Sequence, residues 1–144
     1  AYDILIYQRH LPQTAAFVDR HPGQVFVLDH MGKPIISGEP EEEWKAGITE
    51  LARRENVSCK ISGMVTEVRG KTWDETLLLP YVEHVFASFG AGRVMFGSDW
   101  PVCLLRSNYG RWAEAVRGWI AGLSEDEKVA VMGGNACRVY RIAR

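Results

Sequence analysis

Residues 25–34 read Val-Phe-Val-Leu-Asp-His-Met-Gly-Lys-Pro, and this stretch decides the fold. Its four apolar residues form a run short enough for a strand and apolar enough to be covered on both faces. The polar pair Asp29-His30 ends the run, and Gly32 and Pro34 follow as turn residues. Such an ending is typical of a parallel sheet, in which residues just beyond the carboxyl ends of the strands face the ligand site.

Three further runs share this character. Each is short, apolar, rich in β-prone residues and bounded by turn residues. With the first run included, the expected strands are Asp3 to Tyr7, Val25 to Asp29, Val57 to Ile61 and Arg93 to Gly97.

Segments with helical periodicity separate and follow these strands. Residues 41–54 show it most clearly, because apolar side chains recur on one face, acids crowd the first turn and Arg53-Arg54 end the segment. Ser124 and Glu127 form the pattern of a capping box. The expected helices are Pro12 to Arg20, Glu41 to Arg54, Pro80 to Phe89 after a short turn at Asp74 to Leu79, Arg111 to Ile120, Ser124 to about Gly134, and Asn135 to Tyr140.

The alternation of strands and helices predicts an α/β fold with parallel strands and right-handed crossovers. Four βα units in 144 residues match half of an eightfold barrel, which needs about 250 residues. A small doubly wound sheet is the alternative, and periodicity does not separate the two. We expect residues 1–144 to form one partial barrel domain. The chain opens on a strand-like run without an initiator Met, as a protein entered halfway would.

Composition sets limits on function. The 47% hydrophobic and 24% charged residues are typical of a soluble globular protein. A net charge of -1 gives no electrostatic reason to expect nucleic acid or an anionic membrane as partner. No apolar run reaches the roughly 20 residues that span a bilayer. Three widely spaced cysteines predict neither a disulfide framework nor a zinc knuckle, which makes the cytoplasm the default location.

Polar or aromatic residues follow or end all four expected strands. A neutral imidazole at His30 can bind a metal or donate a hydrogen bond to a carbonyl oxygen. Asp99, between Gly97 and Pro101, can accept a proton from water or bind a metal. The candidate site residues are therefore His30 and Asp99 for catalysis or metal binding, with His10, Lys60 and Trp100 for binding substrate.

Each candidate also has a structural interpretation. His10 can cap a helix or bond a loop carbonyl, and Asp99 can cap a following turn. Lys60 can pair with a substrate carboxylate or with Asp29 or Asp99. No Gly-x-Gly-x-x-Gly, Walker, Gly-x-Ser-x-Gly or His-Glu-x-x-His motif occurs, which argues against dinucleotide, nucleotide-triphosphate, serine-hydrolase and zincin chemistry.

Three ordered motifs together resemble the amidohydrolase-related barrels, and more narrowly their sugar-lactonase branch. They are residues 27–34 (Val-Leu-Asp-His-Met-Gly-Lys-Pro), residues 59–63 (Cys-Lys-Ile-Ser-Gly) and residues 94–101 (Val-Met-Phe-Gly-Ser-Asp-Trp-Pro). The opening residues 2–12 and the closing residues 135–140 fit as well. The resemblance implies a distorted eightfold barrel of which this chain supplies strands five to eight.

The resemblance also assigns roles. Asp99 matches the last-strand aspartate that deprotonates the attacking water, and His30 matches the sixth-strand histidine that polarises the scissile carbonyl or binds metal. The paired histidines of the family's first strand have no counterpart here, as half a barrel predicts. Some members bind one divalent ion, such as zinc, and certain lactonases work without one. His30, Asp99 and His10 are too few ligands for a tight site of their own.

The expected function is therefore hydrolysis of a sugar lactone or similar cyclic ester by water. Amide hydrolysis and metal-dependent decarboxylation are alternatives within the same superfamily. A different class of alternative is a non-catalytic half-barrel that associates with itself, because a half-barrel exposes two sheet edges. We expect a small-molecule substrate and an isolated 144-residue chain that is inactive.

Overall fold

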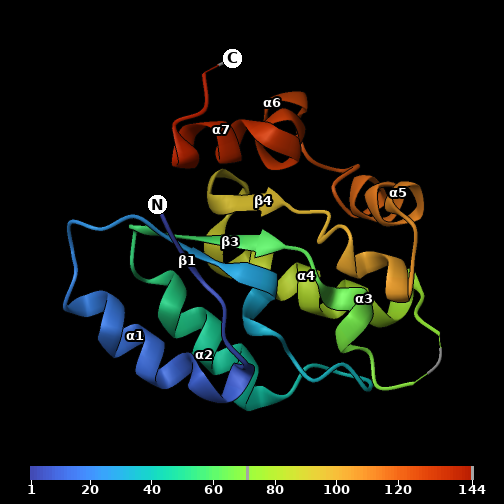
Figure 1. Ribbon diagram of the computed structural model, residues 1–144, viewed down its shortest axis with the longest axis horizontal. Helices are drawn as coiled ribbons and strands as arrows, with labels where there is room; N and C mark the ends of the chain where they lie inside the picture. Colours follow the sequence, from blue (N-terminus) through green and yellow to red (C-terminus); the bar gives the residue numbers. More distant parts are fainter. Residues whose placement is uncertain (71, 144) are drawn as a thin grey trace.

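Four parallel strands form one sheet in the sequential order β1-β2-β3-β4 (Figure 1). The computed structural model describes residues 1–70 and 72–143. A doubly wound sheet reverses its strand order at a switch point, whereas sequential order is that of a barrel wall, so the half-barrel expectation is confirmed. The strands are β1 (Tyr2–Ile4), β2 (Phe26–Leu28), β3 (Val57–Ile61) and β4 (Val94–Phe96).

Helices pack around this sheet. Figure 1 shows α1, α2 and α4 together on one side of it, and α6 and α7 next to the edge strand β4. The expected helical segments are all present, and the bounds of β3 and α7 coincide with the prediction. The helices are α1 (Leu11–Asp19), α2 (Glu42–Ala52), α3 (Met64–Glu67), α4 (Glu75–Phe89), α5 (Tyr109–Trp119), α6 (Glu125–Val129) and α7 (Asn135–Tyr140).

The strand expected from Asp3 to Tyr7 is shorter than predicted. β1 pairs with β2 only as far as Ile4, opposite Leu28. β2 ends there because the chain turns immediately afterwards, so the rest of the β1 run has no strand beside it. Strand length is therefore set by the neighbour, which the sequence of the run does not show. β2 and β4 are each one residue shorter at both ends than expected.

Two expected helices have different bounds. The helix expected to begin at Pro80 begins at Glu75 and runs through the proline, because the Asp74 side chain caps it by accepting a hydrogen bond from the Leu77 amide at 2.8 Å. The helix expected from Ser124 to about Gly134 has its capping box, but α6 ends at Val129 and a wider turn follows. The other segments shift by one or two residues. The helix α3 and the single turns Gln8–His10, Asp29–Gly32, Ala91–Arg93 and Val102–Leu105 were not predicted.

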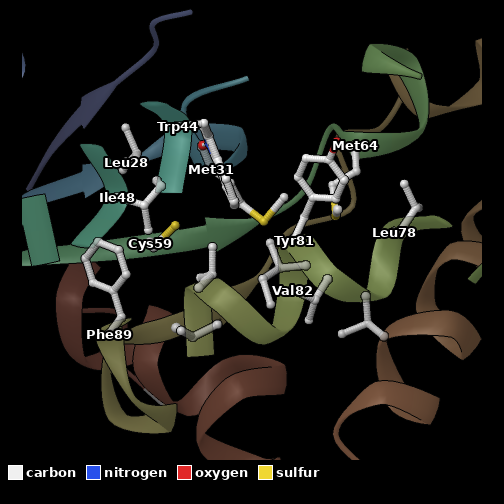
Figure 2. Packing of buried hydrophobic residues seen from close by; sticks show 14 of the residues in the cluster. Leu28, Met31, Trp44, Ile48, Cys59, Met64, Leu78, Tyr81, Val82 and Phe89 are labelled. Atoms are coloured by element: carbon white, nitrogen blue, oxygen red, sulfur yellow. The ribbon is translucent and has the colours of Figure 1, made fainter. Parts of the chain in front are cut away.

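The two faces of the sheet differ in chemistry. One face carries the strand residues of the main apolar core, where Leu28 and Cys59 lie with Ile48 of α2 and Phe89 of α4 (Figure 2). Burial raises the pKa of the Cys59 thiol, as expected of a packing residue rather than a nucleophile. The strand register puts a mixed set on the other face, namely Asp3, Val27, Ser58, Lys60 and Met95.

No helix within the described residues is long and apolar enough to cross a membrane. The cysteines Cys59, Cys103 and Cys137 are all unpaired in the described part of the chain.

Asn135, the first residue of α7, fastens this helix to β4. Its side chain is fully buried, and its Nδ2 group donates hydrogen bonds to the carbonyl oxygens of Ala91 at 2.7 Å and Val94 at 2.6 Å. One amide group therefore satisfies the carbonyl of the first residue of β4 and a carbonyl of the turn before it.

We predict that Asn135→Ala lowers the free energy of unfolding by about 1–3 kcal/mol, because buried carbonyl oxygens lose their donor. Urea denaturation followed by circular dichroism measures this. Gln13→Ala, at an exposed position of α1, is the control and is expected to change stability by less than about 0.5 kcal/mol. Equal stability of the two variants would contradict the role given to Asn135.

Candidate functional site

The chain leaves β2 through a left-handed turn. His30 has φ 53° and Met31 has φ 52°, a conformation that costs non-glycine residues free energy. The buried Trp44 ring of α2 holds this turn, since its Nε1 donates a hydrogen bond to the Met31 carbonyl at 2.9 Å. The Lys33 amide donates to the His30 carbonyl at 2.8 Å. The turn is therefore fixed by its surroundings, as strained backbone at functional sites usually is.

Gly63, just after β3, makes room for the His30 ring. It has φ 66°, and a Cβ atom at this position would lie 2.6 Å from His30 Nδ1. Both the backbone conformation and the close approach therefore require glycine here.

His30 points toward Asp99 and is held from behind by Ser62. Its Nδ1 lies 2.8 Å from the Ser62 hydroxyl, and its Nε2 lies 3.7 Å from Asp99 Oδ1. If the Ser62 hydroxyl donates to Nδ1, then Nε2 carries the proton and can donate to a ligand. If Nδ1–H donates to Ser62 instead, Nε2 is free to bind a metal. Ser62 thus fixes the ring in either role.

The surroundings of His30 favour its neutral form. Burial lowers the pKa of His30 below its ordinary value, and the nearby carboxylates of Asp99 and Asp29 only partly oppose this. A neutral imidazole is the form that binds metals and the form that can donate a hydrogen bond without carrying charge.

Asp99 lies just beyond β4 and also adopts a left-handed conformation, with φ 55°. Two contacts hold its neighbourhood in place. The buried Trp112 ring donates from Nε1 to the Gly97 carbonyl at 2.8 Å, and the Cys103 amide donates to the Asp99 carbonyl at 2.9 Å. The backbone of Asp99 therefore starts a turn, while its carboxylate faces His30.

Lys60 lies on the face of the sheet opposite the main apolar core, here called the inner face, and pairs with Asp29. Its Nζ is 2.5 Å from Asp29 Oδ1 and 3.6 Å from Asp3 Oδ1. Burial alone would lower the pKa of Lys60, but its contacts with Asp29 and Tyr140 together outweigh burial and hold the pKa above its usual value. Tyr140 of α7 donates a hydrogen bond to Asp3. Of the partners left open by the sequence, the structure shows Asp29.

His10 and Trp100, the two remaining candidates, take no part in the contact of Lys60 with Asp29 or in that of His30 with Asp99. His10 has local partners only: its Nδ1 lies 3.4 Å from the Tyr7 amide and its Nε2 lies 3.2 Å from Arg9 Nε. A neutral ring accepts one of these two hydrogen bonds at a time. Trp100 follows Asp99 directly and its side chain is 65% exposed. Their roles in binding substrate stay predictions.

Metal binding by this chain alone does not fit the residues present. A catalytic zinc site has three protein ligands, while His30 and Asp99 supply two. Within residues 1–70 and 72–143, no group of three His, Cys, Asp or Glu side chains is arranged to hold an ion. A complete metal site would need ligands from outside these residues.

Some members of the site were not singled out by the sequence analysis. Ser62 has a usable signal, because it follows β3 directly, as His30 follows β2. Asp29 was named at the end of its strand and as one partner for Lys60, but not as a site residue. Tyr140 has no local signal, since its contact with Asp3 joins residues 137 positions apart.

We predict that Gly63→Ala destabilises the fold by more than about 1 kcal/mol and displaces the His30 ring, because alanine resists this φ and its methyl group overlaps the imidazole. Thermal unfolding and the NMR signals of His30 report the two effects. Gly23→Ala, where a Cβ atom meets nothing within 4 Å, is the matched control and leaves both unchanged. A Gly63→Ala variant with wild-type stability and unshifted His30 signals would contradict this account.

We also predict that His30 titrates below the value of about 6.5 typical of an exposed histidine. At a pH between the lowered pKa of the folded chain and about 6.5, His30 is protonated in the unfolded chain and neutral in the folded chain. The contribution of His30 to stability is therefore fully present above about pH 6.5 and is lost as the pH falls through the lower, folded pKa. An NMR titration of the His30 Cε1 proton measures this pKa, and a midpoint above 6.5 would refute the prediction.

Comparison with known proteins gives these residues a context. The family model described as amidohydrolase matches residues 2–142. L-fucono-1,5-lactonase of Burkholderia ambifaria is 41% identical over 152 residues, covering 100% of this chain and 51% of the relative. L-rhamnono-gamma-lactonase of Scheffersomyces stipitis is 24% identical over 149 residues, covering 90% and 44%. The crystal structure of a Burkholderia multivorans amidohydrolase with bound zinc superposes with a TM-score of 0.92 at 38% identity, covering 99% of this chain and 52% of that one.

The chain thus spans about half the length of the curated relatives it matches. The agreement extends over nearly all of its residues and includes the elements that carry His30 and Asp99. The chain belongs to the amidohydrolase family.

Proposed function

We propose that this chain contributes half of the active site of a hydrolase that opens a sugar lactone or similar cyclic ester. The observation that carries the proposal is the pairing of His30 Nε2 with Asp99 Oδ1 at 3.7 Å, at the end of the sheet where parallel folds bind ligands. The relatives named L-fucono-1,5-lactonase support this substrate class. Residues 1–144 would act as one part of a larger barrel and would be inactive alone.

In the proposed mechanism, Asp99 is the general base. Its carboxylate accepts a proton from a water molecule as the water oxygen attacks the lactone carbonyl. The ring C–O bond then breaks, and the ring oxygen must receive a proton as it leaves. Asp99, protonated in the first step, can return that proton.

His30 acts on the carbonyl oxygen in this proposal. With Ser62 donating to Nδ1, the Nε2–H group can donate a hydrogen bond to the oxyanion that develops during attack. If a divalent ion is present, it would polarise the carbonyl, and His30 and Asp99 would be this chain's share of its ligands. The fixed position of the His30 ring suits both roles, as a hydrogen-bond donor to the oxyanion and as a metal ligand.

Three further residues complete the proposed site. Trp100 would form an apolar wall beside Asp99, and His10 would contact the substrate from the loop after β1. Lys60 would bind substrate with an ammonium N–H donor that is not used in its contact with Asp29. We propose small molecules as the only partners of this function, without nucleic acid or membrane, and the cytoplasm as its location.

The competing proposal is a non-catalytic half-barrel that associates with a second copy of itself. The free edge of the sheet favours it, because large apolar residues are exposed there: Tyr2 is 56%, Leu5 61% and Tyr7 50% exposed. Amide hydrolysis or decarboxylation at the same pair of residues is the alternative within the family.

We predict that Asp99→Asn in the full-length protein lowers kcat for L-fucono-1,5-lactone by at least about 100-fold, since an amide cannot accept the proton. Acid release followed with a pH indicator measures the rate. The control Asp126→Asn, at an exposed position of α6, leaves kcat unchanged.

The outcomes separate the proposals. Sugar lactones left intact at neutral pH would overturn the lactonase proposal, and turnover by Asp99→Asn would overturn the role of Asp99. Concentration-dependent assembly without any turnover would support the non-catalytic half-barrel.

A further inference from the structure

A cavity of about 270 Å³ opens among the same loops that carry the candidate site. Its walls come from the segments that follow β1, β2 and β3, so it lies at the ligand-binding end of the sheet. The pairing of His30 and Asp99 makes no use of it. The lining residues are Tyr7, Gln8, Arg9, Lys33, Ile35, Glu67 and Arg69.

This cavity carries an excess of positive charge. Arg9, Lys33 and Arg69 are cations, whereas Glu67 is the single acid of the lining. Lys33 Nζ lies 3.4 Å from Glu67 Oε1, so that pair is largely neutralised. The remaining two guanidinium groups give the cavity a net positive charge.

The cations are held in place around one aromatic ring. Arg9 and Lys33 lie over the face of Tyr7, at 5.1 and 5.4 Å from its centroid. Cation–π contacts of this kind limit the freedom of long side chains. The positive wall of the cavity is therefore partly ordered before any ligand arrives.

Arg69 has unused hydrogen-bonding capacity. Its backbone amide donates to the Ile36 carbonyl at 2.7 Å, which fixes the start of the side chain. Its guanidinium group makes no hydrogen bond or ion pair with any other residue in the described ranges 1–70 and 72–143. A guanidinium presents a planar fork of donors that matches a carboxylate.

The cavity and the candidate site share two loops. The Lys33 amide is hydrogen-bonded to the carbonyl of His30, and Glu67 ends the short helix α3 that begins after Gly63. A substrate whose carbonyl lies at His30 can therefore extend along these loops. The cavity is slightly smaller than the roughly 300–1,000 Å³ of a pocket for a whole ligand, so it suits one substituent of a ligand.

We propose that this cavity binds a carboxylate substituent of the substrate, so that the hydrolase also accepts lactones of acidic sugars. The carboxylate would be held by the guanidinium of Arg69, with Arg9 and Lys33 adding to the positive field. This inference rests on the proposed function, because it takes the ligand to be the substrate of the hydrolase. Binding of the carboxylate itself does not depend on turnover.

The test compares two sugars that differ only at the relevant group, D-glucuronate and D-glucose, with the full-length protein in an NMR titration. We expect D-glucuronate to bind about fivefold more tightly, which is the upper limit for an exposed charge pair. The amide signals of Tyr7, Lys33 and Arg69 should move with it.

Arg69→Gln should bring the two affinities to within about twofold of one another, because glutamine keeps a donor but loses the charge. Arg117→Gln, at an exposed position of α5, should leave the preference intact. Equal binding of the two sugars by the wild type would overturn the proposal, as would a preference that survives Arg69→Gln. Hydrolysis of lactones without this preference would overturn the carboxylate site alone, while carboxylate binding without hydrolysis would overturn the lactonase proposal alone.

Discussion

The parallel register of β2, β3 and β4 is the constraint on which the candidate site depends. Leu28 lies opposite Cys59, and Cys59 opposite Val94, so the three strands end near one level. The Gly97 amide continues this alignment by donating to the Ile61 carbonyl at 3.0 Å. Side chains a few residues beyond each strand therefore meet, although they are far apart in sequence. The approach of His30 to Asp99 follows from this pairing rather than from any local preference.

Charge on the inner face adds a second constraint. A lysine ammonium there is costly unless it is paired, and Asp29 supplies the partner at 2.5 Å. The Lys60 stem also runs close to Gly97, where a Cβ atom would lie 2.9 Å from Lys60 Cδ. Gly97 therefore has two roles. Its lack of a side chain leaves space for the Lys60 stem beside β4, and its carbonyl accepts the hydrogen bond from Trp112. The position of Lys60 and the path of the chain into Asp99 are coupled.

Sequence patterns predicted what depends on periodicity and strand ends. β3 and α7 have the predicted bounds, and His30 and Asp99 meet as the rule for parallel strand ends requires. What was missed depends on tertiary contacts. The left-handed conformation of His30 is stabilised by Trp44 on another element, and no local pattern signals it. Pro80 predicted a helix start that was wrong, because the helix is capped by Asp74, six residues earlier.

The support of His30 bears on how the site would be completed. Ser62 fixes its ring, Gly63 gives the ring its space, and Trp44 holds the backbone of its turn. All three belong to this chain, so the imidazole is oriented without help from any other segment. Pre-organised groups do not have to be ordered when the substrate binds, which leaves more of the binding energy for the reaction. Any further strands of the barrel would therefore need to supply additional ligands and walls, and would not be required to position His30.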